Sequence, residues 1–170
     1  MTLHSKFNIQ HSKSGFSLIE LSLFMGLFSI ILLVLITIFV ELAQKQLEIQ
    51  SMSSVESDKS YILSRLEYDI SRADAIAIPG ASGDSSDELE LTIDGATYTY
   101  RLTGTVLETD NNGDVQRLNN IRTEITNLSF QRIGNPSGVP SVQVYMDIAS
   151  TFAETSGPRS TAIATTFGIR

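Results

Sequence analysis

Residues 21–40 form a run of twenty positions without a single charged side chain. As an α-helix that rises about 1.5 Å per residue, such a run spans roughly 30 Å, the thickness of the hydrocarbon core of a bilayer. A helix buried inside a soluble domain is rarely apolar on every side over this length. The run therefore predicts a transmembrane helix near the start of the chain.

The flanks of the apolar run predict its orientation. Lys6 and Lys13 precede it with Glu20 as the only acid on that side, whereas Glu41 follows it. This lysine bias places the N-terminus in the cytoplasm and residues 41–170 outside it. A cleaved secretory signal would have a core of about 7–15 residues followed by a small-x-small site. The sequence that ends the run, ITIFVELAQ, contains no such site, so we expect the segment to stay attached.

A single long helix is expected to continue beyond the membrane. Residues 16–78 contain no proline and one glycine, and Pro79-Gly80 then stops the helix. The second half is amphipathic, and Arg65 and Asp69 are expected to form a pair on its solvent face. Its apolar stripe, at spacings of three, four, seven or eight, consists of Leu47, Val55, Ile62, Leu66, Ile70 and Ala73.

After residue 88 the hydrophobic period changes to two, which is typical of strands. Asp94-Gly95 and Asn112-Gly113 are dipeptides of tight hairpins. Further strands are expected around 125–133, 141–149 and 161–169. The expected inward-facing residues are Leu89, Leu91, Ile93, Tyr98, Tyr100, Leu102, Val142, Val144, Met146 and Ile148. The predicted fold is α+β, a long N-terminal helix whose amphipathic half packs on the apolar side of an antiparallel sheet.

The junction before the apolar run reads KSGFSLIEL, residues 13–21. An acid at the edge of an apolar helix persists only if it has a partner or reaches the interface, because a carboxylate at the centre of a membrane helix costs about 2.5–3.5 kcal/mol. The junction resembles the processing site of type IV prepilins: a short basic leader that ends in glycine, then phenylalanine, then glutamate as the fifth residue of the mature chain.

The resemblance implies roles for three residues. A membrane aspartic peptidase, the prepilin peptidase, would cut after Gly15 and methylate the new N-terminus at Phe16. Glu20 would pair with the N-terminal amine of a neighbouring subunit during assembly. The implied plan is a cleaved leader (1–15), a transmembrane and polymerisation half of the helix (16–40), its amphipathic half (41–78) and an antiparallel β domain (79–170), with other pilin or pseudopilin subunits as partners.

The later sequence is similar to W-type minor pilins and J-type minor pseudopilins. The similarity is carried by SRLEYDISRADAI at 64–76, by the step from Tyr100 to Gly104, and by the terminal TTFGIR. It favours a minor over a major subunit of a type IV pilus, a type II secretion pseudopilus or a competence filament. Two other interpretations stay open: an ordinary single-pass anchor, and a permanently anchored binding module whose β domain recognises a ligand outside.

Composition excludes several kinds of chemistry. Loss of residues 1–15 would remove two lysines and both histidines, leaving ten basic and 19 acidic residues and changing the net charge from −7 to −9. The mature chain would then have no His, Cys or Trp, so His or Cys catalysis and His metal ligation are excluded, and we expect no enzyme, cofactor or metal site. The Asp110–Asp114 segment fits a hairpin better than a calcium loop. Net acidity argues against direct nucleic-acid binding.

Overall fold

The computed structural model describes residues 17–134, 138–152 and 157–170, and these contain one helix and nine strands. Gly15 and Phe16, and the leader as a whole, lie outside the described residues. The chain divides into two compact units, an N-terminal unit of residues 1–43 and a globular unit of residues 44–170. The structure therefore has the α+β composition that the sequence predicts.

The helix α1 spans Leu18–Arg72, 55 residues. This confirms one continuous helix through the apolar run and the amphipathic segment. It ends six residues before the predicted boundary, because Ala75–Ile78 form the strand β1 and pair with β3. The alternation of Ala with Ile in this strand buries Ile76 in the core. Strand pairing thus ends the helix before Pro79 could do so.

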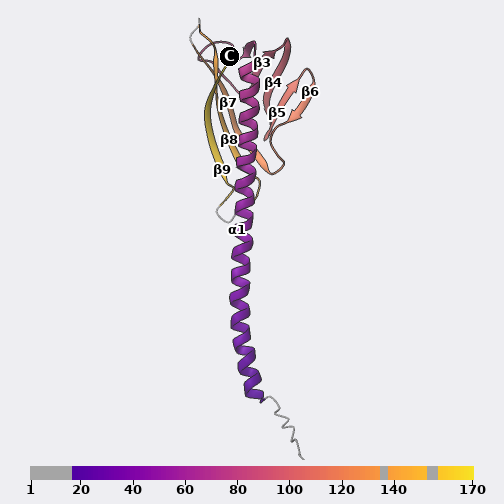
Figure 1. The fold of residues 1–170 in the computed structure, drawn as a ribbon, viewed down its shortest axis with the longest axis vertical. Coiled ribbons are helices and arrows are strands. Elements are labelled where there is room, and N and C mark those ends of the chain that lie inside the picture. Colours follow the sequence, from indigo (N-terminus) through magenta and orange to yellow (C-terminus); the bar gives the residue numbers. More distant parts are fainter. Residues whose placement is uncertain (1–16, 135–137, 153–156) are drawn as a thin grey trace, which may run out of the picture. The chain divides into compact units, whose positions relative to one another are not determined.

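The globular unit contains two antiparallel sheets where the sequence predicted one. Sheet A has the order β1-β3-β4-β5-β6 and sheet B the order β2-β7-β8-β9. In Figure 1, β3–β6 lie on one side of the C-terminal half of α1 and β7–β9 on the other. The further strands are β2 (Ser85–Ser86), β3 (Leu89–Ile93), β4 (Ala96–Thr103), β5 (Val106–Asn111), β6 (Asp114–Arg117), β7 (Thr123–Ile133), β8 (Ser141–Ser150) and β9 (Ser160–Gly168).

Both predicted hairpins are confirmed. Asp94 and Gly95 have φ values of 52° and 75°, and Asn112 and Gly113 have values of 51° and 95°. Positive φ at both central residues defines the type I′ turn, whose twist matches that of the strands it joins. The Gly113 N–H also donates to Asp110 Oδ1 at 2.7 Å, so the acidic side chain closes a turn.

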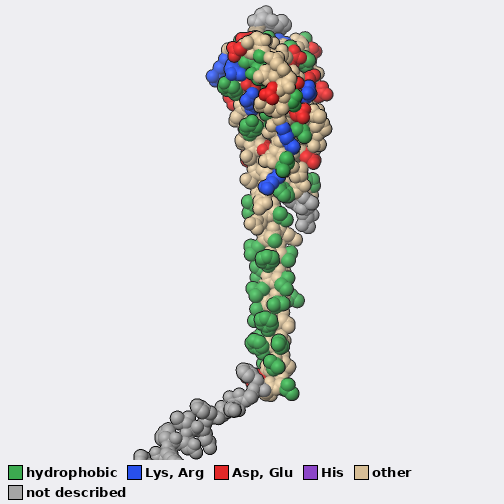
Figure 2. Space-filling model, turned by 90° about the vertical axis from the view of Figure 1, so that its right-hand side faces the viewer, with side chains coloured by type: hydrophobic (Ala, Val, Ile, Leu, Met, Phe, Trp, Pro, Cys, Tyr) green, Lys and Arg blue, Asp and Glu red, His purple; other side chains and the backbone are tan. Residues whose placement is uncertain are grey.

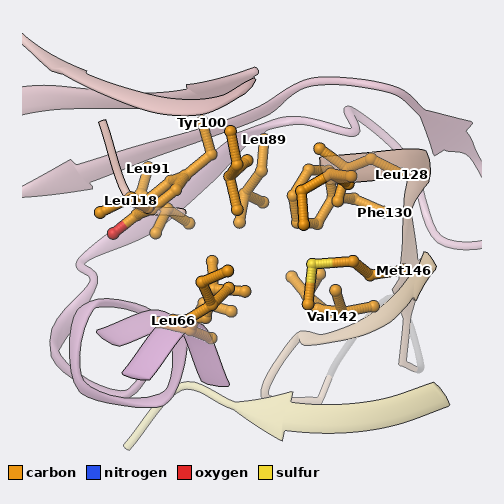
Figure 3. Packing of buried hydrophobic residues seen from close by; sticks show 14 of the residues in the cluster. Leu66, Leu89, Leu91, Tyr100, Leu118, Leu128, Phe130, Val142 and Met146 are labelled. Atoms are coloured by element: carbon orange, nitrogen blue, oxygen red, sulfur yellow. The ribbon is translucent and has the colours of Figure 1, made fainter. Parts of the chain in front are cut away.

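The hydrophobic core lies between the C-terminal half of α1 and the two sheets. Figure 3 shows Leu66 of α1 pointing toward side chains from both sheets, including Leu89, Phe130 and Met146. The other fully buried residues of the hydrophobic core include Ile62, Ile70, Leu91, Ile93, Tyr100, Leu107, Ile125, Val142, Val144 and Ile148. The predicted faces are therefore confirmed, except that Leu47 is 46% exposed and lies one turn before the first buried residue of α1.

Two buried carboxylates attach α1 to the sheets. Asp58 Oδ2 accepts hydrogen bonds from the Asn120 N–H at 2.7 Å and from the Thr123 hydroxyl, which fixes the loop before β7. Asp69 Oδ2 accepts from the Tyr100 hydroxyl of β4 and, at 2.8 Å, from Arg65 Nε. Because each carboxylate accepts two hydrogen bonds, the cost of its burial is offset.

The pair of Arg65 and Asp69 forms as predicted, but its placement on the solvent face is wrong. The Asp69 side chain is fully buried, whereas that of Arg65 is 34% exposed. Asp69 Oδ1 has no hydrogen-bond donor among the described residues, and the nearest cation is Arg72 at 3.6 Å. Burial, together with the hydrogen bond to Asp69, raises the pKa of Tyr100 well above its ordinary value. The phenol therefore stays protonated and keeps donating to the carboxylate.

Candidate functional site

The N-terminal unit presents an apolar helical surface. Among the described residues, α1 is the one helix long and apolar enough to cross a membrane, with a mean hydropathy of 3.0 over its most apolar 18 residues. Every described residue of this unit, from 17 to 43, is exposed within the chain. On the face that Figure 2 shows, hydrophobic side chains cover this helical segment, while charged side chains gather on the globular unit. Such a surface is stable in lipid or against other apolar helices.

The polar side chains of the apolar run are satisfied within the helix. Ser22, Ser29 and Thr37 each donate a hydroxyl proton to a backbone carbonyl three or four residues earlier, at 2.9, 2.8 and 3.0 Å. These bonds remove the cost of exposing a free hydroxyl to hydrocarbon. The run can therefore lie in an apolar medium without any external hydrogen-bond partner for its side chains.

Glu20 is the exception. It lies in the first turn of α1, directly before the uncharged run, and its side chain is exposed. The carbonyl of Ser17 accepts the first bond of the helix, from the Leu21 N–H at 3.1 Å. An acid in this turn is favoured by the helix dipole by about 0.3–1 kcal/mol. No residue among 17–134, 138–152 and 157–170 forms an ion pair with it, so within this part of the chain its charge has no specific counter-ion.

A shallow hollow follows one side of this helix. It is lined by Ile19, Ser22, Leu23, Gly26, Leu27 and Ile30. A Cβ at Gly26 would meet no atom within 4 Å, so the glycine is not required by packing inside the chain. Small residues four apart, Ser22 and Gly26, allow the backbone of another helix to approach closely. The feature suits helix association and contributes no catalytic group.

The described residues offer no group of side chains for binding a metal ion. Within the described ranges, no three His, Cys, Asp or Glu residues lie close enough to hold a metal ion. Sequence reasoning missed the burial of Asp58 and Asp69. The signal was present, since Asp58 lies four residues before Ile62 and Asp69 lies three residues after Leu66 on the buried stripe of α1. These carboxylates fix the helix to the sheets. Glu20 is a candidate for intermolecular pairing.

Comparisons of the chain with known protein families, with characterised proteins and with solved structures find no match.

Proposed function

We propose that this chain is a structural subunit, of the minor class, of a filament of the type IV pilus kind, which includes type II secretion pseudopili and competence pili. One observation carries the proposal. Gly15, Phe16 and Glu20 directly precede an uncharged helical run whose polar side chains form their hydrogen bonds within the helix. A helix of this kind is stable both in a bilayer and in a bundle of identical apolar helices. The same segment would thus serve first as an anchor and then as the core of a filament.

In the proposed pathway the chain first crosses the cytoplasmic membrane once. Lys6 and Lys13 keep the leader in the cytoplasm, and the globular unit lies outside. Prepilin peptidase removes residues 1–15 and leaves a positive amine on Phe16. Glu20 of one subunit then pairs with the amine of its neighbour, which neutralises two charges in an apolar environment. Without such a pair, each charge would resist transfer from the membrane edge into the filament.

The test is a Glu20→Ala variant, with Glu41→Ala as the matched control at the other end of the apolar run. We expect incorporation into filaments to fall about tenfold or more, because an ionic contact of about 1.4 kcal/mol already changes an equilibrium tenfold. Membrane insertion, measured as the carbonate-resistant fraction, should be unchanged in both variants. Glu41→Ala should be incorporated like the parent chain. Normal incorporation of Glu20→Ala would remove Glu20 from assembly and favour the permanently anchored binding module.

A further inference from the structure

The outer edge of β9 is the feature of the globular unit that the proposed function leaves unused. The backbone hydrogen bonds at the two ends of β9 show which of its residues face β8. Ser150 N–H donates to the Arg159 carbonyl at 2.8 Å, and Ile169 N–H donates to the Pro140 carbonyl at 3.3 Å. Bonded pairs alternate along an antiparallel ladder, so the odd-numbered residues of β9 bond to β8. The even-numbered residues direct their N–H and C=O groups away from β8.

These outward groups belong to small residues. The even positions of the strand are Ser160, Ala162, Ala164, Thr166 and Gly168, and all five residues are exposed. Their backbone N–H and C=O groups have no partner among the described residues. The odd positions include Ile163 and Phe167, which pack against the core. The edge is therefore held in an extended shape by its core-facing side chains, while its backbone groups remain open to another strand.

The other edge strands have features that block pairing with a further strand, and β9 has none of them. Edge strands are normally blunted by short length, charge, proline or a bulge. β2 has two residues, β1 has four and an irregular register, and β6 has four that include Asp114 and Arg117. In contrast, β9 has nine residues without charge or proline, and its register with β8 is continuous. A long, regular and uncharged edge is a template for strand addition.

A hollow adjoins the C-terminal half of this edge. Its volume is about 420 Å³, and it is lined by Ser64, Glu67, Tyr68 and Ser71 of α1 and by Thr166 and Gly168 of β9. At this hollow the Arg170 N–H donates to the Ser71 carbonyl at 3.2 Å. A strand added to β9 would lie over this hollow, where Ser64 and Ser71 of α1 and Gly168 of β9 leave room for one larger side chain. Strand addition gains affinity from the backbone and specificity from such a pocket.

The direction of β9 argues against the β9 edge of a second copy as the occupant, and the other edges of such a copy are short, charged or irregular. Arg159 Nη1 lies 3.7 Å from Glu48 Oε1 at one end, and Arg170 contacts Ser71 at the other, so β9 runs in the same direction as residues 48–71 of α1. If the β9 edges of two copies paired antiparallel, Gln44, where each globular unit begins, would lie at opposite ends of the resulting dimer. Each Gln44 continues into an apolar run, and this step rests on the proposed function, in which both runs lie in one membrane. Antiparallel pairs are also two- to three-fold commoner than parallel ones.

We infer that the outer edge of β9 binds an extended strand from a different protein chain, running antiparallel to β9. This strand has small or β-branched side chains opposite Ala162 and Ala164 and one larger side chain over the hollow. The contact extends sheet B from four strands to five. It lies wholly on the globular unit, so it is separate from the contacts of the apolar helix and can be tested apart from them.

The test places a benzophenone photocrosslinking amino acid at position 162, 164 or 166 of the full-length chain in its own cells. Peptide mass spectrometry then identifies the crosslinked residue of the partner. Moving the probe forward by two residues should move the crosslinked site backward by two residues along one partner sequence. This stepwise register is the signature of antiparallel pairing. A probe at Thr97, exposed on the inner strand β4, is the control and should give no such series.

Two variants test whether the backbone edge carries the contact. Ala164→Pro removes a backbone N–H that donates to no described residue and would donate to the added strand. We therefore expect crosslinking from position 162 to fall about tenfold. Ala164→Lys keeps that N–H but adds the charge that protects natural edges, and the same loss is expected. Val115→Lys on β6 is its matched control and should leave crosslinking unchanged. Scattered crosslinks, no crosslinks, or sites within a second copy of this chain would overturn the proposal, as would full crosslinking from Ala164→Lys.

Discussion

Replacing Leu66 with alanine is expected to destabilise the globular unit by about 2–5 kcal/mol. Leu66 is fully buried between the two sheets, so the change removes apolar contacts and leaves a cavity among Leu89, Phe130 and Met146. A domain of this size is stable by about 5–15 kcal/mol, so the loss is a large fraction of the total. Pulse proteolysis of the full-length chain in detergent, across a urea series, measures the change in the free energy of unfolding.

Leu47→Ala provides the control for the Leu66 variant. It is the same substitution on the same helix, but Leu47 is 46% exposed. Its effect should therefore stay within about 1 kcal/mol. Equal losses at the two positions would mean that α1 is not held against the sheets through Leu66. The comparison also separates packing from helix propensity, since both changes replace leucine with alanine in a helix.

Asp69→Ala is expected to destabilise the globular unit by about 2–3 kcal/mol, the cost of leaving buried partners of a charged group unpaired. The change leaves the buried Tyr100 hydroxyl without its acceptor and removes the ion pair with Arg65. The partial exposure of Arg65 keeps the loss below that of a fully buried ion pair. The free energy of unfolding of the full-length chain, measured in urea, gives the size of the effect.

A double-mutant cycle with Tyr100→Phe tests whether Asp69 acts through Tyr100. In the parent chain, Tyr100→Phe removes a donor from a buried carboxylate and should cost about 1–3 kcal/mol. In the Asp69→Ala chain the same change removes an unpaired hydroxyl and should cost little. A coupling energy of about 1 kcal/mol or more is therefore expected. Additive effects would show that the two side chains stabilise the fold independently.

The parts of the fold that were predicted from sequence are those governed by local pattern. The uncharged run predicted the helix, and the period of two predicted the strands. Asp94-Gly95 and Asn112-Gly113 predicted the two hairpin turns, which are of type I′. The inward faces of β3 and β8 also followed from their alternation, because a strand with one buried face places every second side chain in the core. No knowledge of the tertiary arrangement was needed for these features.

What could not be predicted depends on contacts between distant segments. The split into two sheets arises because β7 pairs with β8 and β2 and not with β6, a choice that no local pattern encodes. The burial of Asp69 is offset by the hydroxyl of Tyr100, 31 positions later, and no local pattern identifies that donor. The early end of α1 depends on the pairing of β1 with β3. The open edge of β9 depends in the same way on strand order, because a strand forms an edge only if no other strand pairs with its second side.

The roles of Gly15, Phe16 and Glu20 at the candidate site stay predictions. The position of Glu20 before an uncharged helix is local and is present in the structure. The cut after Gly15 and the new amine on Phe16 are properties of a reaction with another protein, and both residues lie outside the described part of the chain. These steps therefore rest on the resemblance to prepilins and on the chemistry of a lone carboxylate at the edge of a helix apolar enough to cross a membrane.

The most direct test of the proposed function is the intact mass and N-terminal sequence of the protein purified from its own membranes. The proposal predicts a mature chain that begins at Phe16, with or without one additional methyl group on its amine. A chain that still begins at Met1, in cells whose prepilin peptidase is active on other substrates, would contradict it. That result would make the junction at Gly15 a coincidence and leave a permanently anchored protein.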